Sequence, residues 1–390
     1  MVPLPDLSPP TSLRIAHFLP HYPGRDGSAA FCRGLSRAMN RQSVGSCPIL
    51  TLRKGAVVAA ADEELLHYPA VSSGNPFVLP KPLIEDLTIN RHQLDGVVLH
   101  GTYNPPMATM ATHLTKIRLP YLFIPHDPYV SELRHQKRWR KLAYWHLFEK
   151  RMMAGARAVQ LLDESHEPPL RALGVTTPTV VIPNGCELSM LDEIPSTARI
   201  PGTIPHDIRI LYFGRMDRHH KGLDLLLGGF AQALQTAPTL TQNVTLVMTG
   251  NDWTDRQALE RLASDLNIAH RVNFTGRRPE SAMQIVADAD LVILPSRFDG
   301  FGLCIVEAML ASRPVIASSG AGVATHVRNA GGGWTPAPTV ESIAQSLLDA
   351  LTIRNQWPQM GQMNQEYVRN HLTWDQIAVR TIAVYQDLFS

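Results

Sequence analysis

Short, mostly apolar runs alternate along the chain with longer segments that have helical spacing. The runs are continuously apolar and do not alternate with polar residues, which is typical of strands in a parallel sheet covered on both faces. In one of the longer segments, apolar residues fall on a single helical stripe: Leu223, Leu226, Leu227, Phe230 and Leu234. Strands that alternate with such helices predict doubly wound α/β units.

The predicted strands form two groups, separated by a region rich in proline and glycine at about residues 184–206. Such a region predicts a linker between domains. We therefore expect a first Rossmann-like domain over 1–190 and a second over 205–372, facing each other across a cleft, with a last helix over 373–390. The predicted strands are 14–19, 47–52, 96–100, 121–124, 158–161 and 180–182, then 209–213, 244–248, 272–274, 291–294 and 315–317.

Composition narrows the classes of protein that fit this pattern. The chain has 390 residues, too many for one core, and 44% are hydrophobic, which excludes wholesale disorder. Lys and Arg (36) nearly balance Asp and Glu (34), which argues against a dedicated nucleic-acid binder. The four cysteines are scattered and form no CxxC pair, so neither a disulfide framework nor a structural zinc site is indicated.

The same features predict a cytoplasmic protein. Scattered cysteines fit a reducing compartment, and no apolar run approaches the length of a membrane span. Residues 1–12 contain four prolines and lack the basic cluster and apolar core of a signal peptide. We expect any contact with a membrane to be peripheral and on its inner face.

Ligands of open α/β sheets bind at the carboxyl ends of the strands, so the loops that follow strands carry the candidate chemistry. The loop after 209–213 contains Gly214 and Arg215, followed by Lys221 at the start of a helix. Glycine lets the backbone approach a ligand, and the two cations suit a diphosphate, with Arg215 forking onto two oxygens. A solvated turn with surface charges is the alternative interpretation.

The loop after 291–294 combines two glycines with two carboxylates. Gly300 and Gly302 precede a predicted helix, whose free N–H groups and positive dipole end favour an anion. Asp299 and Glu307 bracket this loop and are suited to accept hydrogen bonds from hydroxyls of a sugar and a ribose. The alternative is that Asp299 caps the helix and Glu307 is a solvated residue.

With these residues in place, the chain resembles the retaining nucleotide-sugar glycosyltransferases of family 4, which have the GT-B fold. Asp299 and Glu307 stand where that family has its E-x7-E signature. Further matches run along nearly the whole chain: Ile182-Pro183-Asn184-Gly185, Gly214-Arg215 with Lys221-Gly222, Phe274-Thr275-Gly276, Glu307-Ala308-Met309, Arg313-Pro314-Val315-Ile316-Ala317, Pro120-Tyr121 through His126, and Trp374 with the closing helix.

The resemblance implies a role for each candidate residue. Arg215 and Lys221 would hold the donor diphosphate, Asp299 would contact sugar hydroxyls and Glu307 the ribose. The backbone around Gly300, Phe301, Gly302 and Leu303 would touch sugar and phosphates, and Gly24 to Ser28, including Gly27, would approach the diphosphate. His126 would sit near the reacting sugar, with a structural histidine as the alternative, and the last helix would cross back to the first domain.

Three positions depart from the family pattern. Asp299 replaces the usual Glu and is one methylene shorter, so the donor sugar cannot be carried over. Ser312 stands where a helix-ending glycine is usual. Gly320-Ala321-Gly322-Val323-Ala324-Thr325 lacks the carboxylate of the family's G-G-x-x-E element.

Two apparent metal motifs are discounted. Asp288-Ala289-Asp290 has the D-x-D form, but it lies at the amino end of a predicted strand and thus away from the site. His219-His220 are expected to be loop residues in solvent. We therefore expect no cofactor and no metal, because the cations and the helix end can stabilise a leaving diphosphate.

Residues 134–151 are strongly basic, and Trp139, Leu142, Trp145 and Phe148 recur there at helical spacing. One interpretation is a helix that packs in its domain with a wet basic face. The other is a helix that lies on an anionic membrane, which would indicate a lipid-linked acceptor.

The sequence thus predicts a metal-independent transferase that moves a hexose from a nucleoside diphosphate sugar, with UDP preferred, to an acceptor hydroxyl. No carboxylate is placed to act as a nucleophile, so a front-face retaining route is favoured. The acceptor and the oligomeric state stay open. A nucleotide-sugar epimerase and a non-catalytic nucleotide-sugar binding protein are the alternatives, the latter because of the altered 320–325 segment.

Overall fold

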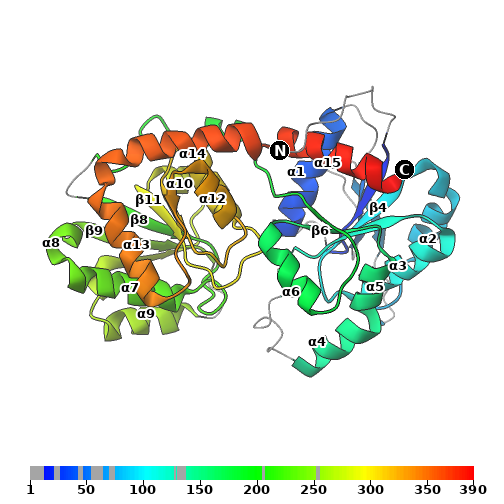
Figure 1. Cartoon of the computed structure of the whole chain (residues 1–390), viewed down its shortest axis with the longest axis horizontal. Coiled ribbons are helices and arrows are strands. Elements are labelled where there is room, and N and C mark those ends of the chain that lie inside the picture. Colours follow the sequence, from blue (N-terminus) through cyan, green and yellow to red (C-terminus); the bar gives the residue numbers. More distant parts are fainter. Residues whose placement is uncertain are drawn as a thin grey trace. The chain divides into compact units, whose positions relative to one another are not determined.

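The protein consists of two compact α/β units (Figure 1). The computed structural model describes residues 13–21, 27–42, 47–53, 65–69, 75–126, 129, 138–203, 207–251 and 255–390. Unit 1 comprises Met1–Gly185 together with Trp374–Ser390, and unit 2 comprises Cys186–Thr373. The chain therefore leaves unit 1 once and returns to it for its last helix.

Unit 1 is built on a parallel sheet with the strand order β3-β2-β1-β4-β5-β6-β7. Its strands are β1 (Ile15–Phe18), β2 (Ile49–Arg53), β3 (Leu65–Pro69), β4 (Gly96–His100), β5 (Tyr121–Ile124), β6 (Val159–Leu161) and β7 (Thr179–Val181). Its helices are α1 (Gly27–Arg41), α2 (Lys81–Ile89), α3 (Pro105–Ile117), α4 (Arg138–Tyr144), α5 (Lys150–Gly155), α6 (Glu167–Ala172) and α15 (Trp374–Phe389).

The last helix, α15, packs on α1 within unit 1, as Figure 1 shows. Gly34 allows this close approach, because a Cβ there would lie 2.1 Å from the indole ring of Trp374. The buried hydroxyl of Tyr385 donates a hydrogen bond to Gln160 Oε1 at 2.7 Å, and Arg41 pairs with Asp375 at 2.9 Å. These contacts attach a segment that is distant in sequence to the sheet of unit 1.

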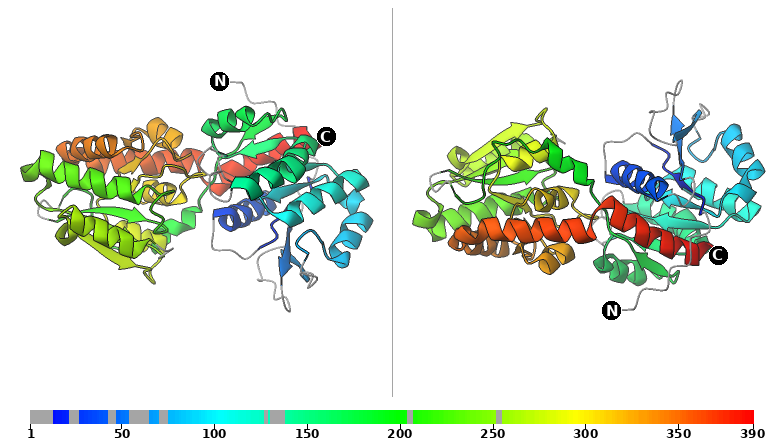
Figure 2. Two further views of the ribbon diagram at one scale, coloured as in Figure 1. Left: turned by 90° about the horizontal axis from the view of Figure 1, so that it is seen from below. Right: turned by 90° about the horizontal axis from the view of Figure 1, so that it is seen from above.

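Unit 2 is built on a second parallel sheet with the strand order β10-β9-β8-β11-β12-β13, and Figure 2 shows its helices on both faces. Its strands are β8 (Ile208–Phe213), β9 (Val244–Thr249), β10 (Val272–Gly276), β11 (Leu291–Leu294), β12 (Val315–Ala317) and β13 (Gly333–Trp334). Its helices are α7 (Leu223–Thr236), α8 (Pro238–Thr241), α9 (Arg256–Asp265), α10 (Ala282–Ala287), α11 (Leu303–Leu310), α12 (Ala324–Ala330), α13 (Val340–Thr352) and α14 (Trp357–His371).

Burial explains which strands could be recognised from hydropathy. Every residue of β1, β4, β5, β11 and β12 is buried, as expected for strands covered on both faces. The sequence did not predict β3 and β13, which lie at sheet edges. In β3, buried and exposed residues are mixed and the strand ends at Pro69, while β13 has only two residues. Neither carries a continuous apolar run.

Asp290 anchors the segment of unit 2 that leads into β8. Its buried carboxylate accepts hydrogen bonds from Arg199 at 2.8 Å and from the backbone N–H groups of Gly202 and Arg209. Because these donors satisfy the charge, the D-x-D motif has a structural explanation at the amino end of β11. The opposite, carboxyl edge of the sheet carries the loops that contain the candidate site.

Ser312 occupies the position after α11 that glycine usually takes. Its φ of 57° lies in the left-handed region, where a side chain costs about 1 kcal/mol relative to glycine. The departure from the family pattern therefore leaves the helix ending in place at a modest cost.

Candidate functional site

Two loops follow the neighbouring strands β8 and β11 of unit 2 and lie at one edge of its sheet. The buried hydroxyl of Tyr212, in β8, donates a hydrogen bond to the carbonyl of Arg215, in the first loop, at 2.6 Å. The backbone N–H of Gly214 donates to Thr249 at 3.0 Å. These bonds fix the turn and leave the Arg215 side chain at the surface.

Lys221 and Asp299 join the two loops through an ion pair. The side chains are only 16% and 13% exposed, so water screens the pair weakly. Burial opposes the charged ammonium, but the Asp299 carboxylate outweighs it and raises the pKa of Lys221. The positive charge of Arg215 lowers the pKa of Lys221, which shows that both cations lie in the same region.

The loop between Asp299 and α11 presents backbone N–H groups. Gly302 precedes the helix with a φ of 101°, and a Cβ there would lie 2.7 Å from Leu294. No side chain caps this helix start, so the N–H groups of Leu303 and Cys304 have no acceptor within the helix. Gly300 lies three residues before Leu303, and Phe301 has a buried ring and turns its N–H toward Asp299 Oδ1 at 3.4 Å.

The altered 320–325 segment supports this loop through the backbone. Asp299 N–H donates to Gly320 at 3.0 Å, and Val323 N–H donates to Phe301 at 2.8 Å. Gly320 must be small, because a Cβ there would lie 2.3 Å from the carbonyl oxygen of Arg297. The segment thus holds the loop although it lacks the family carboxylate.

Glu307 lies in the middle of α11 and is half-buried, so it is not the solvated residue of the alternative interpretation. Burial, with a contribution from the nearby Glu193, raises its pKa to about 7. A carboxyl group at this pKa changes its ionisation close to neutral pH. It accepts hydrogen bonds best in its ionised form.

The thiol of Cys304 shows that these groups share one region. Burial raises its pKa to about 12, and the charges of Lys221, Asp299 and Glu307 all act on it. Cations and carboxylates therefore surround the first turn of α11. This arrangement can bind a ligand that has both an anionic group, held by the cations and the helix N–H groups, and hydroxyl groups, which donate to the carboxylates.

In unit 1, His126 follows β5 and has a φ of 64°. Tyr103 and Tyr129, in the loops after β4 and β5, are also left-handed, with φ values of 52° and 49°. The buried carboxylate of Glu149 holds both, accepting from the Tyr103 N–H at 3.1 Å and from the Tyr129 hydroxyl at 2.6 Å. Such strained backbone gathers at functional sites.

Gly27 is the first residue of α1, and a Cβ there would meet nothing within 4 Å. The rest of its predicted loop, 24–26, lies outside the described residues. Of the discounted histidines, His220 is more ordered than expected, because it donates two hydrogen bonds to Asp217, from its backbone N–H at 2.9 Å and from Nδ1 at 2.7 Å.

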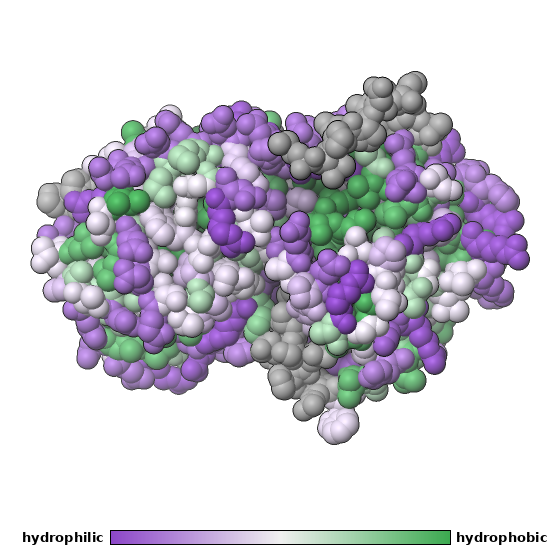
Figure 3. All heavy atoms as spheres, viewed as in Figure 1, coloured by the Kyte–Doolittle hydropathy of each residue, from purple (hydrophilic) through white to green (hydrophobic). Residues whose placement is uncertain are grey.

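The predicted basic helix is divided into α4, a π-helix over Trp145–Glu149 and α5, while residues 134–137 lie outside the described part. Trp145 is buried, whereas Trp139 and Leu147 are 82% and 53% exposed. The apolar stripe thus packs on unit 1 only in part. Figure 3 shows polar and neutral residues over most of the visible face, with apolar residues in smaller patches.

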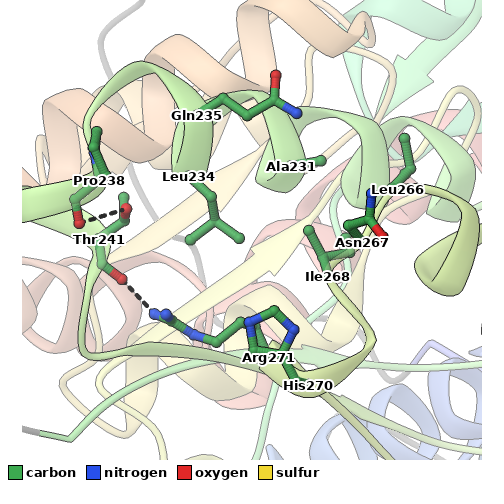
Figure 4. A pocket seen from close by; sticks show the side chains of 10 residues that line it. All are labelled: Ala231, Leu234, Gln235, Pro238, Thr241, Leu266, Asn267, Ile268, His270 and Arg271. Atoms are coloured by element: carbon green, nitrogen blue, oxygen red, sulfur yellow. Dashed lines mark hydrogen bonds between the residues drawn. The ribbon is translucent and has the colours of Figure 1, made fainter.

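A separate pocket of about 250 Å³ lies in unit 2 between the end of α7, α8 and the 266–271 segment that precedes β10 (Figure 4). The guanidinium of Arg271 donates to the carbonyl oxygens of Val244 and Thr241. This pocket is at the amino edge of the sheet, away from Lys221 and Asp299, and its charge is already satisfied. It therefore does not belong to the candidate site.

Sequence reasoning missed three groups that shape these loops. Arg297 forms a bidentate ion pair with Asp224 at 2.7 and 2.9 Å, which ties the 295–302 loop to α7. Glu149 and His17 are buried polar residues in unit 1. His17 could have been recognised as a polar residue inside an apolar run. Nothing in the sequence marked Glu149 as buried, because charged residues surround it there.

Two glycosyltransferase family profiles match the chain. "Glycosyl transferase 4-like domain" matches residues 19–185, and "Glycosyl transferases group 1" matches residues 207–352. D-inositol 3-phosphate glycosyltransferase 1 of Catenulispora acidiphila is 35% identical over 32% of this chain and 31% of its own length. Glycogen synthase of Mycobacterium tuberculosis is 28% identical over 53% of this chain and 47% of its own length. The chain thus spans a third to a half of these curated relatives.

Solved structures resemble nearly the whole chain. Sucrose-phosphate synthase from Thermosynechococcus elongatus has a TM-score of 0.72 at 19% identity and covers 97% of this chain and 99% of its own. HepE of Anabaena, in complex with UDP and glucose, has a TM-score of 0.72 at 19% identity, over 96% of this chain and 100% of its own. At this identity the likeness shows the fold, a two-unit α/β GT-B fold.

Among the described helices, none has an apolar stretch long enough to cross a bilayer.

Proposed function

We propose that this chain, which has the GT-B fold and matches glycosyltransferase family profiles in both units, transfers a hexose from a nucleoside diphosphate sugar to an acceptor hydroxyl with retention of configuration. The observation that carries this proposal is the group of Lys221, Asp299 and Glu307 around the first turn of α11. UDP is the proposed nucleotide, supported by the UDP-glucose complex of HepE and by a trehalose-phosphate synthase described as UDP-forming.

The donor diphosphate binds at the carboxyl edge of the unit 2 sheet. Arg215 and Lys221 supply positive charge there, and the uncapped N–H groups of α11 supply hydrogen-bond donors. Asp299 accepts from a sugar hydroxyl through the oxygen that Lys221 leaves available, and Glu307 accepts from the ribose. Gly214 lets the backbone approach the phosphates, and the role of Gly27 at the diphosphate stays a prediction.

The transfer follows a front-face route. The bond between the anomeric carbon and the β-phosphate oxygen breaks while the acceptor oxygen bonds to the same face of that carbon. The acceptor proton passes to the departing phosphate oxygen, so no protein nucleophile is required. Lys221 and Arg215 stabilise the charge that develops on this oxygen, which is the role a metal ion has in other transferases. His126 donates a hydrogen bond to a substrate hydroxyl.

The exposed Trp139 favours a further part of the proposal, a peripheral contact with anionic membranes through α4. Trp139 lies beside the exposed Arg140, and Leu147 and Arg151 follow on the next turns. Exposed apolar side chains among basic ones suit the boundary of an anionic bilayer. The proposed acceptor for such an enzyme is lipid-linked, and its place of action is the cytoplasmic face.

The proposed function can be tested without knowledge of the acceptor. Full-length protein is first screened with UDP-sugars, GDP-sugars and the bare nucleotides by thermal shift, because a bound donor stabilises the fold. The slow hydrolysis of the best donor is then followed by NMR. We expect the sugar to be released first as the anomer of the donor; release of the opposite anomer would contradict retention, and an altered sugar would indicate an epimerase.

Replacement of Lys221 by Ala should lower turnover at least tenfold, because the leaving diphosphate loses its buried positive charge. Turnover is measured at saturating donor, with thermal unfolding as the check on folding. Lys116→Ala, an exposed lysine of α3, is the matched control. Since Asp299 loses its partner in the first variant, Lys221→Ala/Asp299→Asn should fall by less than the product of the single effects. Near-normal turnover of Lys221→Ala would remove Lys221 from its proposed role.

Donor affinity should rise with pH through neutrality. Burial raises the pKa of Glu307 to about 7, so the carboxylate that accepts from the ribose is scarce at pH 6 and abundant at pH 8. The diphosphate of UDP-glucose does not titrate in this range. For this donor we expect Kd to be about tenfold higher at pH 6 than at pH 8, which means weaker binding at pH 6. Calorimetry measures Kd, and Glu307→Gln should remove the dependence; an unchanged slope in that variant would exclude Glu307 as its source.

Vesicle flotation tests the membrane contact. Full-length protein should float with vesicles that contain phosphatidylglycerol and should remain unbound with pure phosphatidylcholine. Trp139→Ala should reduce the bound fraction several-fold, whereas Ile89→Ala, which removes a 75% exposed side chain from α2, should not. Equal binding of both variants would show that α4 is not the contact.

A further inference from the structure

Three histidines form a hydrogen-bonded chain at the centre of the unit 1 sheet. His17 lies in β1, His100 ends β4, and His126 follows β5, and these strands are adjacent in the order β1-β4-β5. His17 Nδ1 lies 2.7 Å from His100 Nε2, and His100 Nδ1 lies 3.0 Å from His126 Nε2. His17 and His100 are fully buried, and His126 is half-buried at the outer end.

Burial favours the neutral form of all three imidazoles. Burial lowers the pKa of His17 and of His126 to about 3. Burial, and then the neighbouring His17 and His126, lowers the pKa of His100 well below its usual value. A neutral imidazole carries one N–H and one bare nitrogen. Two hydrogen bonds in series therefore require all three rings to be the same tautomer.

The inner end of the chain selects between the two tautomers. His17 Nε2 is buried and has no hydrogen-bond partner among the described residues. A buried N–H without an acceptor is the rarer and costlier of the two orphans. The proton of His17 therefore resides on Nδ1 and is donated to His100, and that of His100 is donated in turn to His126. His126 then keeps its own proton on Nδ1.

The packing around the chain holds these orientations. Phe31 of α1 packs with ring centroids 5.8 Å from His100 and 5.2 Å from His126. The ring of Trp374 lies edge-on to Phe31 at 5.6 Å, so α15 supports the same cluster. The left-handed backbone of His126, with a φ of 64°, is the kind of strain that persists only under such constraint.

A metal site is the competing explanation, since donor atoms of His17, Cys32 and His100 lie within 4.8 Å of one another. Two nitrogens on one tetrahedral metal, with bonds of about 2.0–2.1 Å, would stand about 3.3 Å apart. The 2.7 Å separation between His17 and His100 is shorter than that and matches a hydrogen bond.

We propose that His17 and His100 are positioning residues that hold His126 as a neutral hydrogen-bond donor through Nδ1, and thereby exclude it as a base. The consequence for transfer rests on the proposed function, in which His126 donates to a substrate hydroxyl and the proton of the acceptor goes to the departing phosphate. The tautomer itself does not rest on that function.

The tautomer is read directly by long-range ¹H–¹⁵N NMR spectra of full-length protein with ¹⁵N-labelled histidine between pH 6 and 8. The three resonance sets are assigned from variants at each position. We expect each ring to be neutral with its proton on Nδ1 throughout this range. An imidazolium, or a proton on Nε2 of His126, would overturn the proposal. So would Zn²⁺ that is retained through gel filtration and shifts these resonances.

Two substitutions of His100 separate positioning from a merely structural role. Asn can still donate to His126 Nε2 from the place of Nδ1, whereas Phe cannot. We expect His100→Phe to lower kcat at least tenfold with little change in donor KM, and His100→Asn to restore most of kcat and the Nδ1–H state of His126. Equal losses in both variants would contradict the proposal. His92→Phe and His92→Asn, at an exposed histidine, are the controls.

Failure of the proposed function gives a different result. If His126→Ala transfers sugar at the normal rate, His126 has no role in transfer, although the NMR spectra still show the tautomer. If the Nδ1–H state is absent while His126→Ala is inactive, the positioning proposal alone fails. The wild-type spectra decide the tautomer even where His100→Phe does not fold.

Discussion

The ion pair between Lys221 and Asp299 joins two loops that leave adjacent strands of the unit 2 sheet. Parallel strands end at the same edge, so one pair of side chains can fix the distance between both loops. The remaining parts of the site are built around it: Arg297 ties the second loop to α7, and Gly320 lets a third segment pair with the same loop. A ligand that binds at these loops therefore meets an ion pair in which the charges of Lys221 and Asp299 already balance each other.

The fold class and the candidate loops of unit 2 followed from hydropathy because buried parallel strands leave continuous apolar runs. The apolar runs of β8 and β11 are continuous in the sequence, and glycines follow each of them closely. Both features are local and can be recognised directly from the sequence. The edge strands β3 and β13 have no such run. The GT-B fold is confirmed and both units match glycosyltransferase family profiles, whereas the reaction and the roles of Arg215, Glu307 and the other site residues stay predictions.

The arrangement of unit 1 was harder to predict, because its polar groups meet only through strand order. His17, His100 and His126 are far apart in the chain and become neighbours since β1, β4 and β5 are adjacent. Glu149 lies among basic residues in the sequence, yet it is buried in a π-helix and holds two loops. Hydropathy cannot show which polar residues of different elements share an interior.

The separation of α15 from the rest of unit 1 in sequence has a consequence for how the protein is made. Trp374–Phe389 is translated after all of unit 2. A nascent unit 1 therefore emerges from the ribosome before the indole ring of Trp374 can pack on Gly34. Unit 2 is one continuous segment and can complete its own core first. During synthesis, unit 1 is therefore begun first and completed last. The apolar surface of α1 remains uncovered until α15 has been made.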